Sequence, residues 1–84
     1  MEMADVAERA REQMAKMTKL PISGVTAVSK ADRGWVVTVE VVEKKSIPDG
    51  ADILGIYEVK LNEQGQVDDF QRLRLRRRSD TVEE

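Results

Sequence analysis

The stretch from Gly34 to Leu61 most constrains what this chain can fold into. It reads GWVVTVEVVEKKSIPDGADILGIYEVKL, in which two runs rich in valine, isoleucine and other strand-forming residues flank a segment with Pro, Gly and two Asp. β-branched and aromatic residues favour strands, whereas Pro, Gly and Asp favour turns. The stretch is therefore predicted to be a long antiparallel hairpin with its turn over Ser46–Asp52.

The side chains of these two runs divide between two faces, because alternate residues of a strand point to opposite sides of the sheet. The odd-numbered face is almost wholly apolar and is expected to form the core: Trp35, Val37, Val39, Val41, Ile53, Tyr57, Val59 and Leu61. The even-numbered face is mixed, and its Glu40 is expected to oppose Lys60 across the strands.

Four apolar residues remain on the even-numbered face, namely Val36, Val42, Leu54 and Ile56. A contiguous apolar patch on a solvent-facing sheet often marks a docking site. Two interpretations stay open: the four residues form a partner-binding patch, or they are scattered or covered by a loop or the tail.

The rest of the chain supplies one helix and two further strands. Apolar residues at spacings of three and four predict an amphipathic helix over residues 3–18, which Leu20-Pro21 ends. Strands are predicted over 25–30, 35–45, 53–61 and 66–76. In the last strand Val67, Phe70, Leu73 and Leu75 do not keep a period of two, which a bulge near Asp68-Asp69 would reconcile.

The predicted fold class is α+β. Short connections make the strands antiparallel neighbours, so the helix is expected to pack on a four-stranded antiparallel meander with a cystatin-like or PepSY-like outline. Residues 1–78 form a single predicted domain, and 79–84, which lack apolar periodicity, are predicted to be a disordered tail.

Composition argues against catalysis. The 84 residues include no cysteine and no histidine, which excludes the common catalytic triads and most transition-metal sites. Asp49 and Asp52 flank a turn glycine without the spacing of a calcium loop. The protein is therefore predicted not to be an enzyme and to bind no cofactor, metal or small-molecule substrate. The charged N-terminus lacks the apolar region of a signal peptide, no apolar run could span a membrane, and a cytoplasmic location is expected.

The sharpest charged feature is a series of arginines near the C-terminus: Arg72, Arg74, Arg76, Arg77 and Arg78. The first three alternate along the predicted last strand and are expected to share one face as an unneutralised basic stripe. Three interpretations remain open. The stripe guards a sheet edge against aggregation, binds an acidic protein surface, or binds nucleic acid through phosphates. The net charge of −2 and the lack of a stacking platform make nucleic acid the least favoured.

These residues together resemble a known family. The series from Gly34 to Glu43, then Ile47-Pro48-Asp49, Asp52-Ile53-Leu54 and Tyr57 to Leu61, followed by Gly65 and the arginine-rich end, is similar to the gas vesicle accessory protein GvpO family. The resemblance runs from about Leu20 to Arg78. A broader similarity to PepSY-type domains, through Tyr57-Glu58-Val59 and a glycine turn, covers less of the chain.

The GvpO resemblance implies a non-enzymatic accessory protein that contacts other gas vesicle proteins during vesicle assembly, in the cytoplasm and in possible association with the vesicle. Residues expected to carry these contacts are Val36, Val42, Leu54, Ile56, Arg72, Arg74, Arg76, Arg77 and Arg78. The alternatives are a nucleic-acid-binding regulator that uses the arginine stripe and a PepSY-like protein-binding or inhibitory module. The direct partner and the stoichiometry are left open.

Overall fold

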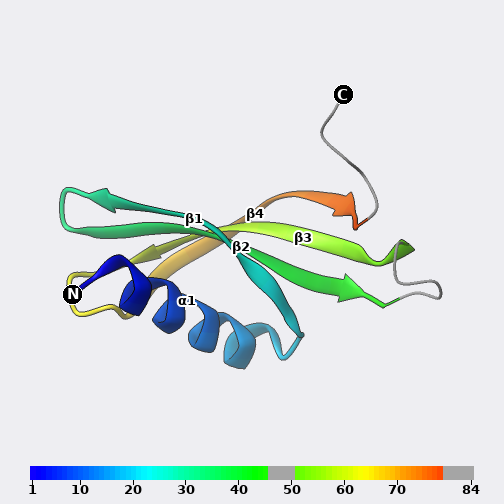
Figure 1. Cartoon of the computed structure of the whole chain (residues 1–84), viewed down its shortest axis with the longest axis horizontal. Helices are drawn as coiled ribbons and strands as arrows, with labels where there is room; N and C mark the ends of the chain where they lie inside the picture. The colour runs from blue at the N-terminus through cyan, green and yellow to red at the C-terminus, as the bar shows by residue number, and fades with distance from the viewer. Residues whose placement is uncertain (46–50, 79–84) are drawn as a thin grey trace.

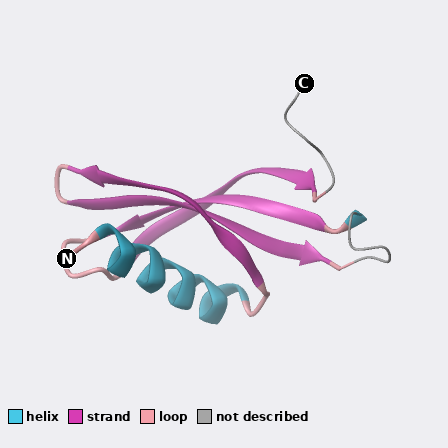
Figure 2. Cartoon of the chain, viewed as in Figure 1, coloured by secondary structure: helices cyan, strands magenta, loops and turns pink. Residues whose placement is uncertain are grey.

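A computed structural model describes residues 1–45 and 51–78 of the chain. One helix, α1 (Met3–Thr18), precedes four strands: β1 (Ile22–Ala31), β2 (Gly34–Lys44), β3 (Ile53–Leu61) and β4 (Val67–Arg77). The strands form one antiparallel sheet in the order β1-β2-β3-β4 (Figures 1 and 2). The α+β prediction is confirmed. Most of the predicted Ser46–Asp52 turn and the predicted disordered tail at 79–84 lie outside the described residues.

Helix α1 uses one apolar stripe to hold the sheet. Val6, Ala10 and Met14 are completely buried, whereas Met3 and Met17, near the two ends of the helix, are exposed. The helix ends before Pro21, because Lys19 adopts a left-handed conformation (φ 59°) and donates its N–H to Ala15 O. This geometry closes the last turn of the helix.

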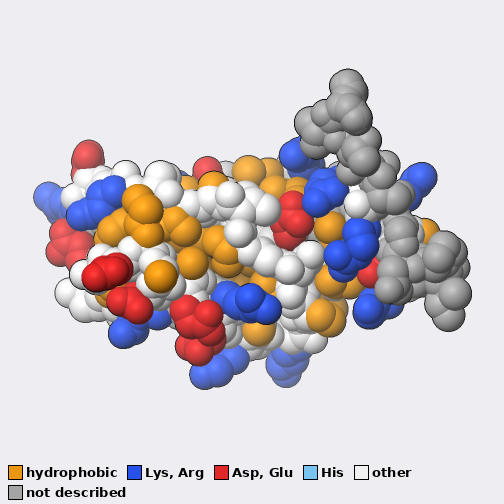
Figure 3. All heavy atoms as spheres, in the orientation of Figure 1, with side chains coloured by type: hydrophobic (Ala, Val, Ile, Leu, Met, Phe, Trp, Pro, Cys, Tyr) orange, Lys and Arg blue, Asp and Glu red, His pale blue; other side chains and the backbone are white. Residues whose placement is uncertain are grey.

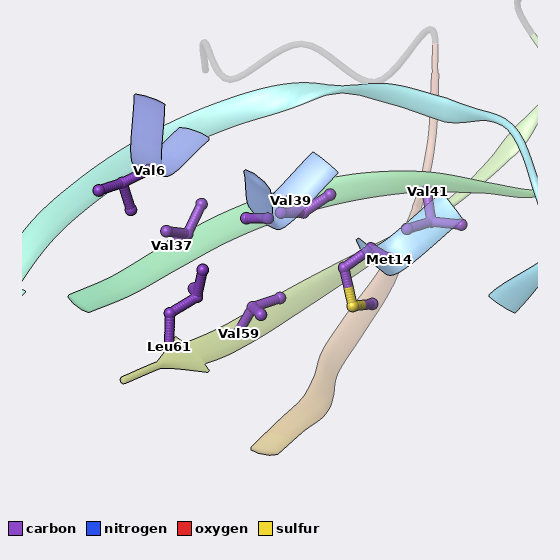
Figure 4. Packing of buried hydrophobic residues seen from close by; sticks show 8 residues of the cluster. Val6, Met14, Val37, Val39, Val41, Val59 and Leu61 are labelled. Atoms are coloured by element: carbon purple, nitrogen blue, oxygen red, sulfur yellow. The ribbon is translucent and has the colours of Figure 1, made fainter. Parts of the chain in front are cut away.

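The core lies between α1 and one face of the sheet, which we call the helix face (Figure 4). Of the eight odd-numbered residues of β2 and β3 that were predicted to form it, Trp35 and Tyr57 only pack against it while partly buried, and Ile53 is not part of it. The other five form it and are at most 2% exposed, since period-two alternation places them on one side: Val37, Val39, Val41, Val59 and Leu61. We call the other side of the sheet the opposite face.

The helix covers only part of the helix face. α1 packs mainly against β1 and β2 (Figure 1), because a single helix is about as wide as two strands. Near its middle, Gln13 ties the helix to the turn between β3 and β4. Its side-chain amide donates to Gly65 O at 2.8 Å and accepts from Val67 N at 2.9 Å.

Strand β1 is longer than the predicted 25–30. It begins directly after Pro21, whose carbonyl accepts the N–H of Val42 at 2.8 Å, and two register irregularities interrupt its pairing with β2. These irregularities obscure the alternation on which the sequence-based bounds rested, so only the middle of the strand was recognised. The two described turns carry glycine where it was expected, and Gly65 has the positive φ of 84° that favours this residue.

Candidate interaction site on the last strand

Strand β4 is an edge of the sheet, bonded to β3 on one side only. Its first irregularity confirms the predicted bulge: Asp69 opposes Lys60 and Val67 opposes Leu61, so Asp68 is the extra residue. The bulge returns Val67 to the helix face, where it packs against the core.

A second bulge, which the sequence pattern did not reveal, occurs at Leu73. Arg74 opposes Ile56, whereas Arg72 opposes Tyr57, so Leu73 is the extra residue. An inserted residue reverses the alternation of side chains. Arg72 therefore lies on the helix face, and Arg74 and Arg76 lie on the opposite face. The prediction that these three arginines share one face is wrong for this reason.

Arg72, Arg76 and Arg78 hold carboxylates, which corrects the expectation of an unneutralised stripe. Arg76 Nη2 binds both carboxylate oxygens of Glu40, at 3.0 and 3.2 Å. Arg78 Nε lies 3.3 Å from Asp52 Oδ2. Glu40 opposes Ile56 rather than the expected Lys60, and the long Arg76 side chain reaches it across β3.

The third pair is Arg72 with Glu43. Arg72 Nη1 lies 3.8 Å from Glu43 Oε2, and half of the arginine side chain is exposed. The pair is therefore longer and more solvated than that between Arg76 and Glu40. The sequence offers no short-range signal for any of these partners, because each acid is at least 26 residues away from its arginine along the chain.

Glu43 has a second partner on the helix face. The Tyr57 hydroxyl donates to Glu43 Oε2 at 2.6 Å, and the Tyr57 ring lies 6.0 Å from that of Phe70, centre to centre. Burial raises the pKa of the Tyr57 phenol above its ordinary value, and the hydrogen bond and negative charge of Glu43 raise this pKa further, while Arg72 opposes the shift.

A glycine makes room for this contact. A Cβ on Gly55 would lie 2.3 Å from Glu43 Oε2 and 2.9 Å from Tyr57 Cε1. The Tyr57–Glu43 hydrogen bond therefore passes over a position where only glycine fits without displacing a side chain.

The predicted docking patch on the opposite face is not open to solvent. Val42, Leu54 and Ile56 are 5%, 1% and 5% exposed, and Val36 is half-buried. Three of the four residues predicted to form the patch are therefore buried, and their role in binding stays a prediction.

The exposed apolar side chains of the sheet are instead on β4. Phe70, Leu73 and Leu75 are 38%, 51% and 49% exposed. Phe70 opposes Val59 and Leu75 opposes Gly55, so both lie on the helix face, beyond the strands that α1 covers. Among the described residues, the other exposed large apolar side chains are the methionines Met1, Met3 and Met17.

Positive charge gathers where β4 ends. Figure 3 shows blue lysine and arginine side chains clustered at this end of the molecule, beside the residues drawn in grey. Lys44, Lys45 and Arg74 are exposed, and none of the three forms an ion pair within the described part of the chain. We call these three residues the basic end.

The described residues offer little to three other kinds of site: a metal site, a membrane-spanning helix and a catalytic pocket. No group of three or more potential ligands could hold a metal ion within residues 1–45 and 51–78, and no described helix has the length and hydropathy needed to cross a membrane. A shallow hollow of about 510 Å³ lies at the β1–β2 turn, lined by Asp32, Arg33, Trp35, Lys60 and Asp68 among others. Charges of both signs line it without a nucleophile–base pair.

Comparison with known proteins decides the family. The family described as gas vesicle synthesis protein GvpO matches residues 1–81. The chain belongs to the GvpO family. Gas vesicle protein O1 of Halobacterium salinarum is 38% identical over 76 residues, which cover 90% of this chain and 64% of the relative. Gas vesicle protein O of Haloferax mediterranei is 35% identical over 83 residues, which cover 98% of this chain and 59% of the relative.

A bacterial GvpO relative extends the comparison. Gas vesicle protein O of a Streptomyces species is 34% identical over 62 residues, which cover 74% of this chain and 48% of the relative. The chain thus spans between about half and two thirds of the length of these curated relatives. No solved structure matches it.

Within the GvpO match, the residues that carried the resemblance serve the fold. Gly34 lies where an added Cβ would be 1.9 Å from Leu61 O, and Tyr57 holds Glu43. The signature segment at residues 47–49 lies outside the described residues.

Proposed function

We propose that this chain acts in gas vesicle assembly, in the cytoplasm, by binding another gas vesicle protein through the basic end. Membership of the GvpO family supports the assembly role, and the relatives are named gas vesicle proteins. The proposal treats the chain as an accessory protein rather than an enzyme.

The observation that carries the proposed contact is the surplus of positive charge at one end of the sheet. Arg72, Arg76 and Arg78 are engaged by carboxylates, which makes them structural supports of that end. Lys44, Lys45 and Arg74 are exposed and lack such partners among the described residues. Charge complementarity raises the association rate and sets specificity, so an acidic protein surface fits this end.

The same ion pairs weaken the nucleic-acid alternative. A carboxylate that lies against an arginine offsets part of its positive charge and so weakens its attraction for a phosphate, and phosphate contacts supply most of the affinity for nucleic acid. Tyr57 and Phe70 are in contact with each other in a tilted arrangement, which does not provide parallel platforms for successive bases. A protein partner therefore accounts better for this surface.

The test is a charge reversal with a matched control. The triple variant Lys44→Glu, Lys45→Glu, Arg74→Glu removes the basic end, and the variant Lys16→Glu, Arg33→Glu, Lys60→Glu makes the same change in net charge at other exposed positions. Each other gas vesicle protein of the same organism is immobilised and tested for binding. We expect the first variant to lose at least about tenfold in affinity, about 1.4 kcal/mol, and the second to bind normally.

Equal binding by the two variants would remove the basic end from the contact. A duplex DNA and a single-stranded RNA are measured in parallel at low and high salt. Binding to either that falls steeply with salt, in proportion to the phosphates contacted, would favour the nucleic-acid alternative over the proposal.

A further inference from the structure

We infer that β4 pairs antiparallel with β4 of a second copy of this chain, about a two-fold axis that passes beside Arg72. This contact goes beyond the proposed function, because it concerns the chain with itself and requires no other gas vesicle protein. Of the basic end, Lys44, the last residue of β2, and Lys45 stay available in such a dimer, whereas Arg74 lies within the paired strand.

Strand β4 has the features of a pairing edge. It is 11 residues long, its outer side has no neighbouring strand in the described sheet, and such a row of backbone donors and acceptors is a template for another strand. It also carries the exposed Phe70, Leu73 and Leu75. Pairing would satisfy the outer backbone groups and bury apolar area together.

In the ladder with β3, the two bulges place apolar and charged residues of β4 symmetrically about its centre, an arrangement that the sequence does not show directly. Without the extra residues Asp68 and Leu73, nine residues occupy successive positions of the ladder with β3: Val67, Asp69, Phe70, Gln71, Arg72, Arg74, Leu75, Arg76 and Arg77. Arg72 is the central one. Phe70 and Leu75 lie two positions to either side of it, and Asp69 and Arg76 lie three positions to either side.

A two-fold axis at the central position therefore makes the strand complementary to itself. Residues opposed across an antiparallel pair share a face and interact. Phe70 of each copy meets Leu75 of the other on the helix face, and Asp69 of each copy meets Arg76 of the other on the opposite face. An isologous contact of this kind occurs twice in the dimer, so each favourable pair is formed twice.

Other registers either oppose like charges or pair fewer positions. An axis at Gln71 would oppose Asp69 to Arg74 without like charges, but it would pair only seven of the nine positions. Moving the axis by two positions, to Leu75, would oppose Arg72 to Arg77 and Arg74 to Arg76, which places like charges together. In the proposed register two Arg72 side chains meet at the axis, but each has the carboxylate of Glu43 at 3.8 Å. Of the possible axes, the one at Arg72 pairs all nine positions.

Sedimentation of the unmodified chain is the first test. A contact along one strand buries less than the ~1,200–2,000 Å² typical of stable complexes, so concentrations from about 1 to 500 µM are needed. We expect the mass to rise from 9.5 kDa towards twice that value. Phe70→Lys should weaken the association at least about tenfold, whereas Met17→Lys, also exposed, should not change it.

Cysteine cross-linking locates the axis, because the chain contains no cysteine of its own. Opposed Cα atoms in an antiparallel pair are ~4.5–5.5 Å apart, which a disulfide can span. Arg72→Cys should therefore form a disulfide-linked dimer under mild oxidation. Gln71→Cys, whose copies would lie about 8 Å apart, and Ser29→Cys on the β1 edge should not.

A monomer at the highest concentration would overturn the inference and favour the interpretation of the arginines and bulges as a guard against edge pairing. Equal cross-linking of Arg72→Cys and Ser29→Cys would also overturn it. Circular dichroism of each variant verifies its fold. Because only this chain is present, either result leaves the proposed contact with another gas vesicle protein untouched.

Discussion

The hydroxyl of Tyr57 donates a hydrogen bond of 2.6 Å to Glu43 across Gly55. This bond joins the middle of β3 to the end of β2 on the part of the helix face that α1 leaves uncovered. It also fixes Glu43 where the carboxylate meets Arg72 of β4. A single phenol thus helps to connect three strands, and its protonation is part of the stability of the sheet.

We expect Tyr57 to titrate above its ordinary value of about 10, since burial and Glu43 both raise its pKa. A pKa that is higher in the folded than in the unfolded chain adds stability below the unfolded value. That stability is lost as pH rises through the folded pKa. Tyr57 is the single tyrosine of the chain, so absorbance at 295 nm reports it directly.

Glu43→Gln tests the cause of this shift. The amide keeps an acceptor but removes the charge, so the pKa of Tyr57 should move back towards the ordinary value, and Tyr57→Phe should abolish the signal. An unchanged titration in Glu43→Gln would show that burial alone sets the pKa.

Gly55→Ala should destabilise the protein. The new methyl group would collide with Glu43 at 2.3 Å, so Glu43 must move and the Tyr57 hydrogen bond must lengthen or break. We expect a loss of about 1–3 kcal/mol in the free energy of unfolding, measured by chemical denaturation. Gly24→Ala is the matched control, because nothing lies within 4 Å of its Cβ position, and it should cost much less.

The two ion pairs between β2 and β4 should differ in strength. Arg76 binds both oxygens of Glu40 in a partly buried setting, whereas Arg72 lies 3.8 Å from Glu43 and is half exposed. Double-mutant cycles with alanine should give a coupling of about 1 kcal/mol for Arg76–Glu40 and below about 0.5 kcal/mol for Arg72–Glu43. The reverse order would contradict this ranking.

Met14→Ala should cost about 2–5 kcal/mol in the free energy of unfolding, because it removes a fully buried side chain that holds α1 to the sheet and leaves a cavity. Met17→Ala, three residues along the same helix but 47% exposed, should cost little. Thermal and urea unfolding of the two variants provide the comparison. Similar losses would mean that the described packing of α1 is incorrect.

Local periodicity was sufficient to predict the elements and the core. The spacing of Val6, Ala10 and Met14 in a helix of period 3.6, and of Val37, Val39 and Val41 in a strand of period two, follows from backbone geometry alone. The turn at Gly65 followed in the same way, since a positive φ favours glycine.

The partners of the arginines could not be predicted, because they depend on register. Arg76 reaches Glu40 because the bulge at Leu73 places Arg76 opposite Leu54, on the face of the sheet that carries Glu40. The burial of the opposite face could not be predicted either. Val36, Val42, Leu54 and Ile56 were assigned to it correctly by alternation, but alternation does not determine which face is covered.

For this protein, then, the sequence by itself determined the type of each described helix and strand and most of the residues that meet beneath α1. Only the tertiary structure decided where the charges of β4 point, since the bulge at Leu73 is defined by the pairing with Ile56 and Tyr57. The physical reason is that the two properties depend on residues at different separations along the chain. Helix and strand periods are properties of neighbouring residues, whereas one inserted residue in an edge strand changes the face of every side chain beyond it, and pairing with the adjacent strand sets its position.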